Sequence, residues 1–120
     1  MSILSLIENW IEDEDKVLDL GCGDGKILAE LKLKKKIVAL GVEIEDKNIE
    51  ICLIKGLNVI EQNIDNGLSN FTDDSFEIVI MSQTIQVLKK PEYALREITR
   101  IGNKCIVTIP NFGNWRSRLA

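Results

Sequence analysis

The sequence predicts an α/β domain built on a doubly wound, mostly parallel sheet of about five strands with helices on both faces. Short β-branched runs alternate with stretches whose apolar residues recur at helical spacing, which is typical of strand–helix–strand units. Residues 37–45 (IVALGVEIE) are almost continuously apolar, as in a strand covered on both faces. A glycine-rich turn follows the first strand, at the edge where such sheets bind ligands. The length of 120 residues fits a single domain over 1–120.

The first half is expected to hold two strands, each preceded and followed by a helix. Apolar residues at helical spacing predict a first helix with one packed face: Ile3, Leu6, Ile7, Trp10 and Ile11. A strand at 17–20 leads through the glycine turn into a helix at 26–35, and the 37–45 strand follows. Asp46 can cap the next helix, and Gly56 stands where that helix would end. We expect the following residues of these two helices to face inward: Ile27, Leu28, Leu31, Ile49, Cys52 and Leu53.

The second half is expected to add three strands, at 58–64, 76–81 and 104–109, with a loop at 65–75. A helix begins within 84–88 and restarts at Pro91, and Gly102 marks its exit. Its inward residues are expected to be Ala94, Leu95, Ile98 and Ile101. Residues 110–120 are predicted to be irregular.

Composition narrows the function classes. The formal net charge of −4 lacks the basic face that nucleic-acid binding requires, so we expect no such partner. No apolar run approaches the roughly 20 residues that span a bilayer, and three cysteines without CxxC spacing fit reduced thiols, so we expect a cytoplasmic protein without a membrane partner. The absence of histidine argues against a zinc site and a Ser-His-Asp triad, and no metal is expected.

The turn after the first strand, VLDLGCGDG, predicts a small-ligand site. Gly21, Gly23 and Gly25 allow close backbone approach, and Asp19 adds a fixed acceptor. A phosphate-binding P-loop would need Ser or Thr after Gly25-Lys26, where Ile27 stands. A dinucleotide motif would need its third glycine one residue later, which weakens that alternative without removing it.

An acid followed by GxGxG, with Glu43 ending the next strand, resembles motif I of the class I S-adenosylmethionine-dependent methyltransferases, whose fold is Rossmann-like. The further segments GVEIEDKNI, VIEQNIDNGL, FEIVIMSQTIQVL and PNFGNWRSR narrow the resemblance to the methionine-biosynthesis family MetW, over residues 16–118. Two ribose hydroxyls can both donate to one carboxylate, which suits Glu43.

The resemblance implies a cofactor-binding set for S-adenosylmethionine. Asp19 and the three glycines, with Cys22 between them, would surround the methionine part, and Glu43 would hold the ribose. Ile44 would flank the adenine, Asn63 with Ile64 would lie beside it, and Asp65 is an alternative acceptor. Ser82 and Gln83 would line the cofactor near the methyl group. No catalytic residue is nominated.

The resemblance also implies methyl transfer to an unidentified small molecule. One alternative is a non-catalytic cofactor-binding partner or regulator of homoserine O-acyltransferase, and a second is an NAD-linked oxidoreductase. Methyltransferase domains of this class usually continue into a C-terminal antiparallel hairpin, which we expect to be missing because the chain stops at Ala120. Strand five would then be an exposed edge, open to pairing in a homodimer unless the chain is a fragment.

Overall fold

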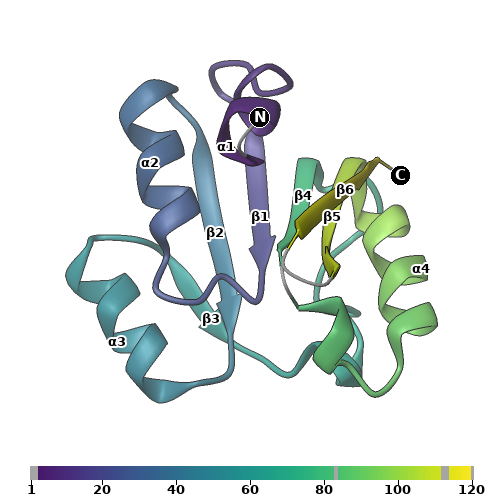
Figure 1. Cartoon of the computed structure of the whole chain (residues 1–120). Coiled ribbons are helices and arrows are strands. Elements are labelled where there is room, and N and C mark those ends of the chain that lie inside the picture. Colours follow the sequence, from purple (N-terminus) through teal and green to yellow (C-terminus); the bar gives the residue numbers. More distant parts are fainter. Residues whose placement is uncertain (1–2, 83, 112–113, 120) are drawn as a thin grey trace.

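A six-stranded sheet forms the centre of the computed structural model, which describes residues 3–82, 84–111 and 114–119 (Figure 1). The strand order is β3-β2-β1-β4-β5-β6. The strands are β1 (Lys16–Leu20), β2 (Val38–Glu43), β3 (Val59–Glu61), β4 (Phe76–Ser82), β5 (Gly102–Asn111) and β6 (Asn114–Leu119). The first five run parallel, and β6 pairs antiparallel with β5. The predicted doubly wound α/β fold is confirmed.

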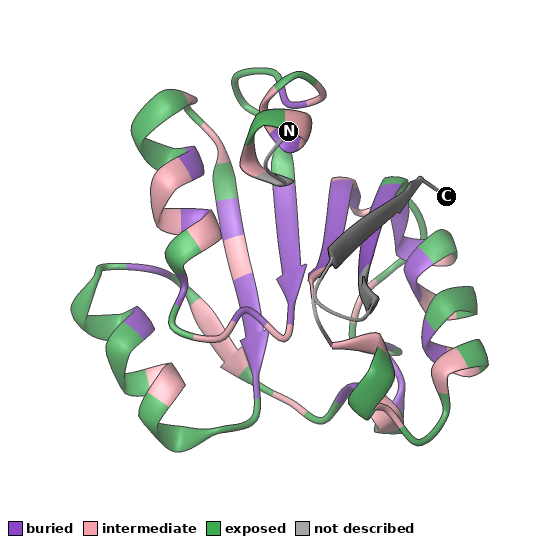
Figure 2. Ribbon diagram, in the orientation of Figure 1, coloured by how far each residue is buried: buried purple, intermediate pink, exposed green. Residues whose placement is uncertain are grey.

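Helices cover both faces of this sheet. The helices are α1 (Ile3–Glu8), α2 (Lys26–Lys34), α3 (Asp46–Ile54) and α4 (Pro91–Ile101), with short 3-10 turns η1 (Ile64–Asn66) and η2 (Ile85–Val87). One buried cluster joins the sheet to side chains of α1, α2 and α3, and a second joins its other face to α4 and η1. Figure 2 shows the resulting pattern, in which the central strands are buried and the outward sides of the helices are exposed.

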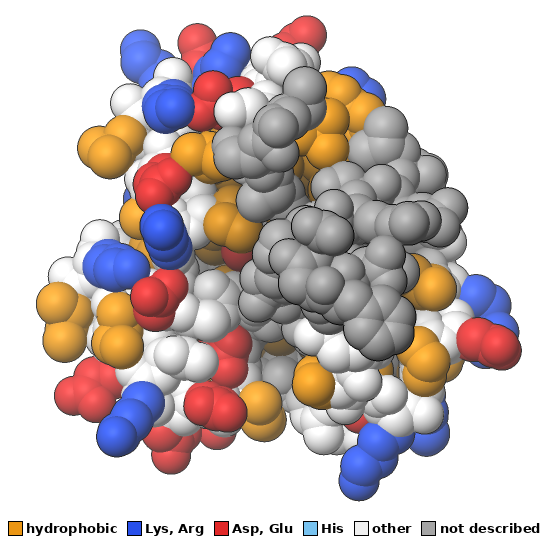
Figure 3. All heavy atoms as spheres, in the orientation of Figure 1, with side chains coloured by type: hydrophobic (Ala, Val, Ile, Leu, Met, Phe, Trp, Pro, Cys, Tyr) orange, Lys and Arg blue, Asp and Glu red, His pale blue; other side chains and the backbone are white. Residues whose placement is uncertain are grey.

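Several element boundaries and inward positions differ from the prediction. The first helix ends at Glu8, although Ile7 and Ile11 are both buried as expected. Leu53 is 59% exposed and Leu95 is 37% exposed, so both predictions of inward packing are wrong. Because the edge strand β3 is short, little of the sheet lies beneath α3, and only Cys52 of this helix is buried. Figure 3 shows hydrophobic side chains among the charged ones over α2 and α3.

The described parts of the C-terminal segment, 110–111 and 114–119, are strands and not irregular. β6 pairs with β5 from Ile106↔Leu119 to Asn111↔Asn114, so strand five is not the sheet edge along this stretch. The returning chain satisfies backbone groups that an edge strand would expose. The expectation of an unpaired strand five is wrong, and the homodimer through that edge loses its basis. A hairpin lying wholly beyond strand five is a different element, and its absence stays a prediction.

Within the described part of the chain, no helix is both long and apolar enough to cross a membrane. The parallel strands all end at one edge of the sheet. The predicted ligand residues lie at or just after those ends, so the fold brings them to one edge of the sheet.

Candidate functional site

The glycine turn after β1 is fastened to the end of β2 by backbone hydrogen bonds. The N–H groups of Gly21 and Cys22 both donate to the Val42 carbonyl, at 2.8 and 3.0 Å. The next bond reaches a side chain, because Gly23 N–H donates to Glu43 Oε1 at 2.9 Å. The two strands that the sequence singled out therefore share one ligand edge.

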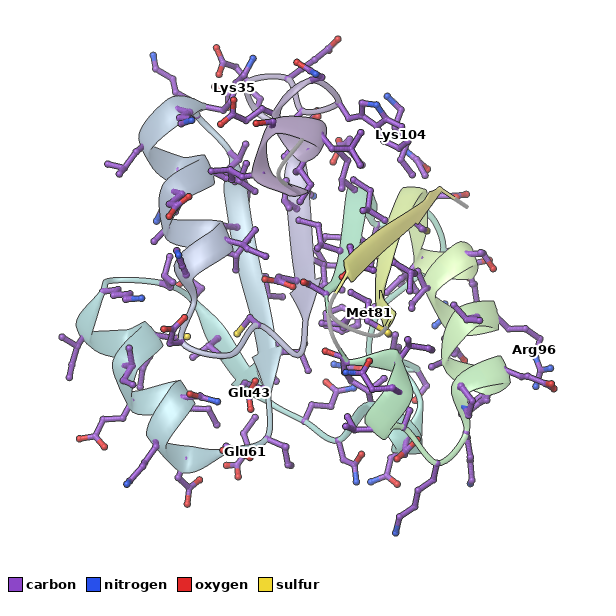
Figure 4. The ribbon with its side chains drawn as sticks, viewed as in Figure 1. Lys35, Glu43, Glu61, Met81, Arg96 and Lys104 are labelled. Atoms are coloured by element: carbon purple, nitrogen blue, oxygen red, sulfur yellow. The ribbon has the colours of Figure 1, made fainter. Side chains whose placement is uncertain are left out.

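Two backbone hydrogen bonds fix the Glu43 side chain at this edge. It is 8% exposed, and its second carboxylate oxygen accepts from the Glu45 N–H at 3.0 Å. Figure 4 shows Glu43 and its register partner Glu61 at the ends of β2 and β3. Each carboxylate oxygen of Glu43 has a further lone pair available, so the two backbone bonds orient the group without exhausting its capacity to accept.

Different structural constraints favour glycine at the three positions of the turn. All three have positive φ angles, of 71°, 59° and 81° for Gly21, Gly23 and Gly25, which favours glycine at each. A Cβ on Gly21 would lie 2.3 Å from Thr84 Oγ1, and one on Gly25 would lie 2.4 Å from a Leu57 methyl group. A Cβ on Gly23 would meet nothing within 4 Å. The close approach of a ligand to the backbone, expected of all three, therefore suits Gly23, while the other two glycines make room for neighbouring side chains.

Asp19 is an unusual buried carboxylate. It is 1% exposed, and neither of its oxygens has a hydrogen-bond partner among the described residues. Burial, followed by the charge of Glu43, raises the pKa of Asp19 from 3.8 to about 8. A buried polar group without a partner is costly, so this carboxylate is suited to a ligand that brings a donor or a positive charge.

Cys22 packs beneath the turn. Its thiol lies 3.8 Å from that of Cys52 and fills the space where Gly41 lacks a side chain. Burial, then the nearby Asp19 charge, raises the pKa of the Cys22 thiol, which keeps it protonated and unreactive. The Cys22 side chain is therefore turned away from a ligand, and its backbone N–H and carbonyl are bonded to Val42 and Gly25.

A cavity of about 250 Å³ opens beside Glu43. Its lining includes six residues predicted for the site: Gly21, Glu43, Ile44, Asn63, Ile64 and Asp65. The residues that the sequence analysis did not assign to the cofactor are Val42, Glu45, Gln62, Thr84, Val87 and Leu88. The last three follow β4 directly, so their position after a strand's carboxyl end is the signal that could have found them.

Asn63 and Asp65 line the cavity and also hold local structure. The Asn63 side-chain oxygen accepts from the Asp65 N–H at 3.0 Å, which caps η1. The Asp65 carboxylate accepts from the N–H groups of Lys89 and Lys90, at 3.0 to 3.1 Å, ahead of α4. Both predicted adenine acceptors are thus already engaged, and only their spare lone pairs can bind a ligand.

Ser82 lies at the carboxyl end of β4 but does not line the cavity. Its hydroxyl oxygen accepts from Thr108 on β5 at 3.2 Å. Gln83, the other residue predicted near the methyl group, lies outside the described residues. Asp19, Cys22, Gly23 and Gly25 also do not line this cavity, so the structure brings together the adenine and ribose residues more closely than the methionine ones.

No cluster of three or more potential metal ligands occurs among the residues that the structure describes. Among the described residues, the side chains lining the cavity include three carboxylates and no Lys or Arg. Such a site favours a ligand carrying positive charge over one carrying phosphates.

Solved structures share this fold. A SAM-dependent methyltransferase from Thermotoga maritima, described as a possible histamine N-methyltransferase, is 31% identical, with a TM-score of 0.71 over 88% of this chain and 49% of that one. A TehB-like SAM-dependent methyltransferase from Corynebacterium glutamicum is 21% identical, with a TM-score of 0.78 over 94% of this chain and 64% of that one. The second likeness supports the fold alone.

Sequence relatives give the family. A bifunctional methionine biosynthesis protein MetXA/MetW from Rhodopirellula baltica is 34% identical in an alignment 104 residues long that covers 80% of this chain and 17% of that protein. The chain thus spans about a sixth of this curated relative's length. Residues 2–120 match the family described as methionine biosynthesis protein MetW. The chain belongs to the MetW family and has the fold of class I methyltransferases.

Proposed function

We propose that this protein binds S-adenosylmethionine across the carboxyl edge of β1 and β2 and transfers its methyl group to a small molecule. The observation that carries the proposal is Glu43, a nearly buried carboxylate oriented by Gly23 and Glu45 at the mouth of the cavity. Its spare lone pairs suit the two hydroxyls of a ribose.

The adenosine half of the ligand fits the cavity. Apolar side chains from three separate segments line it: Ile44, Ile64, Val87 and Leu88. Ile44 is 54% exposed and Val87 is 71% exposed, so a planar base between them would remove apolar surface from water. Asn63 offers the base a polar contact at the rim.

The methionine half fits the opposite side of the turn. The open position beside Gly23 admits a ligand close to the backbone, and the unpartnered Asp19 carboxylate suits the ligand's ammonium group. An ammonium beside Asp19 would favour the charged carboxylate and offset the cost of its burial. A dinucleotide would instead bring a diphosphate to a turn that carries Asp19 and Asp24, which makes the NAD alternative less favourable.

The bound cofactor supplies an electrophilic methyl group on a sulfonium. This chain's residues would bind and orient that group, and alignment of nucleophile, methyl and sulfur can supply much of the rate. The sequence contains no histidine, and no described residue is nominated as a general base.

A second candidate function is a cofactor-binding partner of an acyltransferase of methionine biosynthesis. One observation favours it: the relative from Rhodopirellula baltica carries MetXA and MetW in one polypeptide. The two candidates share the cofactor site and differ in whether the methyl group leaves it.

Thermal unfolding with added ligand tests the cofactor binding that both candidate functions share. S-adenosylmethionine at about 100 times its dissociation constant is expected to add about 2.7 kcal/mol, enough to raise Tm by several degrees. S-adenosylhomocysteine is expected to do the same, and NAD is not. Glu43→Gln, which replaces one accepting oxygen, is expected to weaken binding at least about tenfold. Glu61→Gln on the neighbouring strand is the matched control, because Glu61 is exposed and outside the cavity.

A folded sample that neither methyl-cycle ligand stabilises would contradict both candidate functions. Methyl-labelled cofactor incubated with a metabolite extract separates them. Label in a new small molecule supports the enzyme, whereas tight binding without label transfer supports the partner.

A further inference from the structure

Thr84 lies where the two halves of the proposed site meet. β1 and β4 pair up to Leu20↔Met81, and beyond this point their chains separate toward opposite faces of the sheet. In doubly wound sheets, this divergence opens the ligand crevice. Thr84 stands in that opening, two residues after β4.

The Thr84 hydroxyl bridges the two diverging chains. Its Oγ1 lies 3.1 Å from the Ser82 carbonyl and 3.4 Å from the Leu20 carbonyl, so it can donate to the end of either strand. It thereby extends the contact between β1 and β4 past their last backbone pair.

The Thr84 side chain is also seated against Gly21. A Cβ on Gly21 would lie 2.3 Å from Thr84 Oγ1 and 2.9 Å from Thr84 Cγ2, so the absence of a Gly21 side chain is what admits the threonine. Gly21 and Thr84 both line the cavity, whereas Asp19 and Gly23 do not. The pair therefore lies at the boundary between the cavity and the Asp19 side of the turn.

We infer that Thr84 is a positioning residue that fixes the passage from the adenosine half to the methionine half of the ligand site. This inference rests on the proposed function. The hydroxyl holds the start of the glycine turn at a set distance from the β4 end, and the amino-acid part of the ligand must pass this point to reach Asp19. Loss of the hydroxyl should affect ligands that cross the boundary and spare those that stop before it.

Calorimetric titration of the full chain with two probes tests the inference. S-adenosylhomocysteine crosses the boundary, and methylthioadenosine lacks the amino-acid part. Thr84→Val, which keeps the branched shape, is expected to raise Kd for S-adenosylhomocysteine about tenfold, and Kd for methylthioadenosine less than about twofold. Thr84→Ser keeps the hydroxyl and is expected to restore the first Kd to within about threefold of wild type. Thr84→Ala gives the same comparison if the valine variant does not fold.

Thr99→Val is the matched control, since Thr99 is exposed on α4 and its hydroxyl donates to the Arg96 carbonyl at 2.9 Å. It is expected to leave both Kd values unchanged. The inference would be overturned if Thr84→Val weakened the binding of both probes equally or of neither. It would also be overturned if Thr84→Ser bound S-adenosylhomocysteine as poorly as Thr84→Val does. A wild-type protein that binds neither probe contradicts the proposed function instead.

Discussion

At the residue scale, Asp19 couples stability to pH. Its pKa is about 8 in the folded protein and 3.8 as an ordinary aspartate, so between these values the native state holds a proton that the unfolded chain has lost. Stability from this group is therefore present at low pH and falls as pH rises from about 4 to 8, by up to about 1.4 kcal/mol per unit. The stability of Asp19→Asn relative to wild type is therefore expected to be greater at pH 8 than at pH 5.

Urea unfolding of both proteins at the two pH values measures this difference. The asparagine variant is also expected to lose S-adenosylmethionine binding, because it cannot offer the ammonium a charge. A variant that gains stability while losing binding would identify Asp19 as a residue kept for its ligand. A stability difference that is the same at pH 5 and pH 8 would refute the linkage.

The glycines give a second residue-scale prediction. Gly21→Ala and Gly23→Ala both meet a positive φ, but only the first also collides with Thr84. Gly21→Ala is expected to cost clearly more folding free energy, whereas Gly23→Ala is expected to cost about 1 kcal/mol and to lose ligand affinity through its newly filled approach. Denaturation and calorimetry on the two variants separate the effects. A Gly23→Ala protein with full affinity would argue against a ligand at that position.

At the element scale, Asp65 anchors the entry to α4. Its carboxylate accepts from the N–H groups of Lys89 and Lys90, which precede Pro91. Asp65→Ala leaves these donors without that partner and is expected to cost about 1 to 2 kcal/mol in the free energy of unfolding. Glu92→Ala is the control, because it removes a carboxylate from the first turn of the same helix that makes no hydrogen bond to the described residues. It is expected to lower the free energy of unfolding much less. Equal losses in urea unfolding would refute the anchoring role.

Element order was predictable from the sequence, and element ends were less so. β1, β2 and β4 are short runs of apolar and β-branched residues that read as buried strands on local grounds. β3 shortens to Val59–Glu61 because the Asn63 side chain caps η1, a competition that composition does not reveal. β6 depends on pairing with β5, which is set by tertiary contact rather than by its own residues.

The same distinction holds for the site. Glu43 and the glycines follow from spacing along the chain, since parallel strands end at one edge. Thr84 follows a strand end, but its contact with Gly21 could not be predicted, because that contact depends on the crossing of the glycine turn and the β4 end, which lie more than 60 residues apart in sequence. The orphaned state of Asp19 likewise required three-dimensional burial to become visible.

At the scale of the whole molecule, ligand binding and sheet order combine in one prediction. β1 and β4 lie at the centre of the sheet, while β3 and β6 form its edges. Amides of the central strands should exchange with solvent through global unfolding, and edge amides through local opening. A ligand that binds only the native state at about 100 times its dissociation constant lowers the globally unfolded fraction about 100-fold. Hydrogen exchange of β1 and β4 should therefore slow by about that factor with S-adenosylmethionine, while β6, remote from Glu43 in the strand order, should change little.

The edge strand β3 gives the sharper test, because its last residue, Glu61, pairs with Glu43. Ligand at Glu43 should therefore slow exchange in β3 more than in β6. Equal slowing of β3 and β6 would contradict a ligand held at the β2 end.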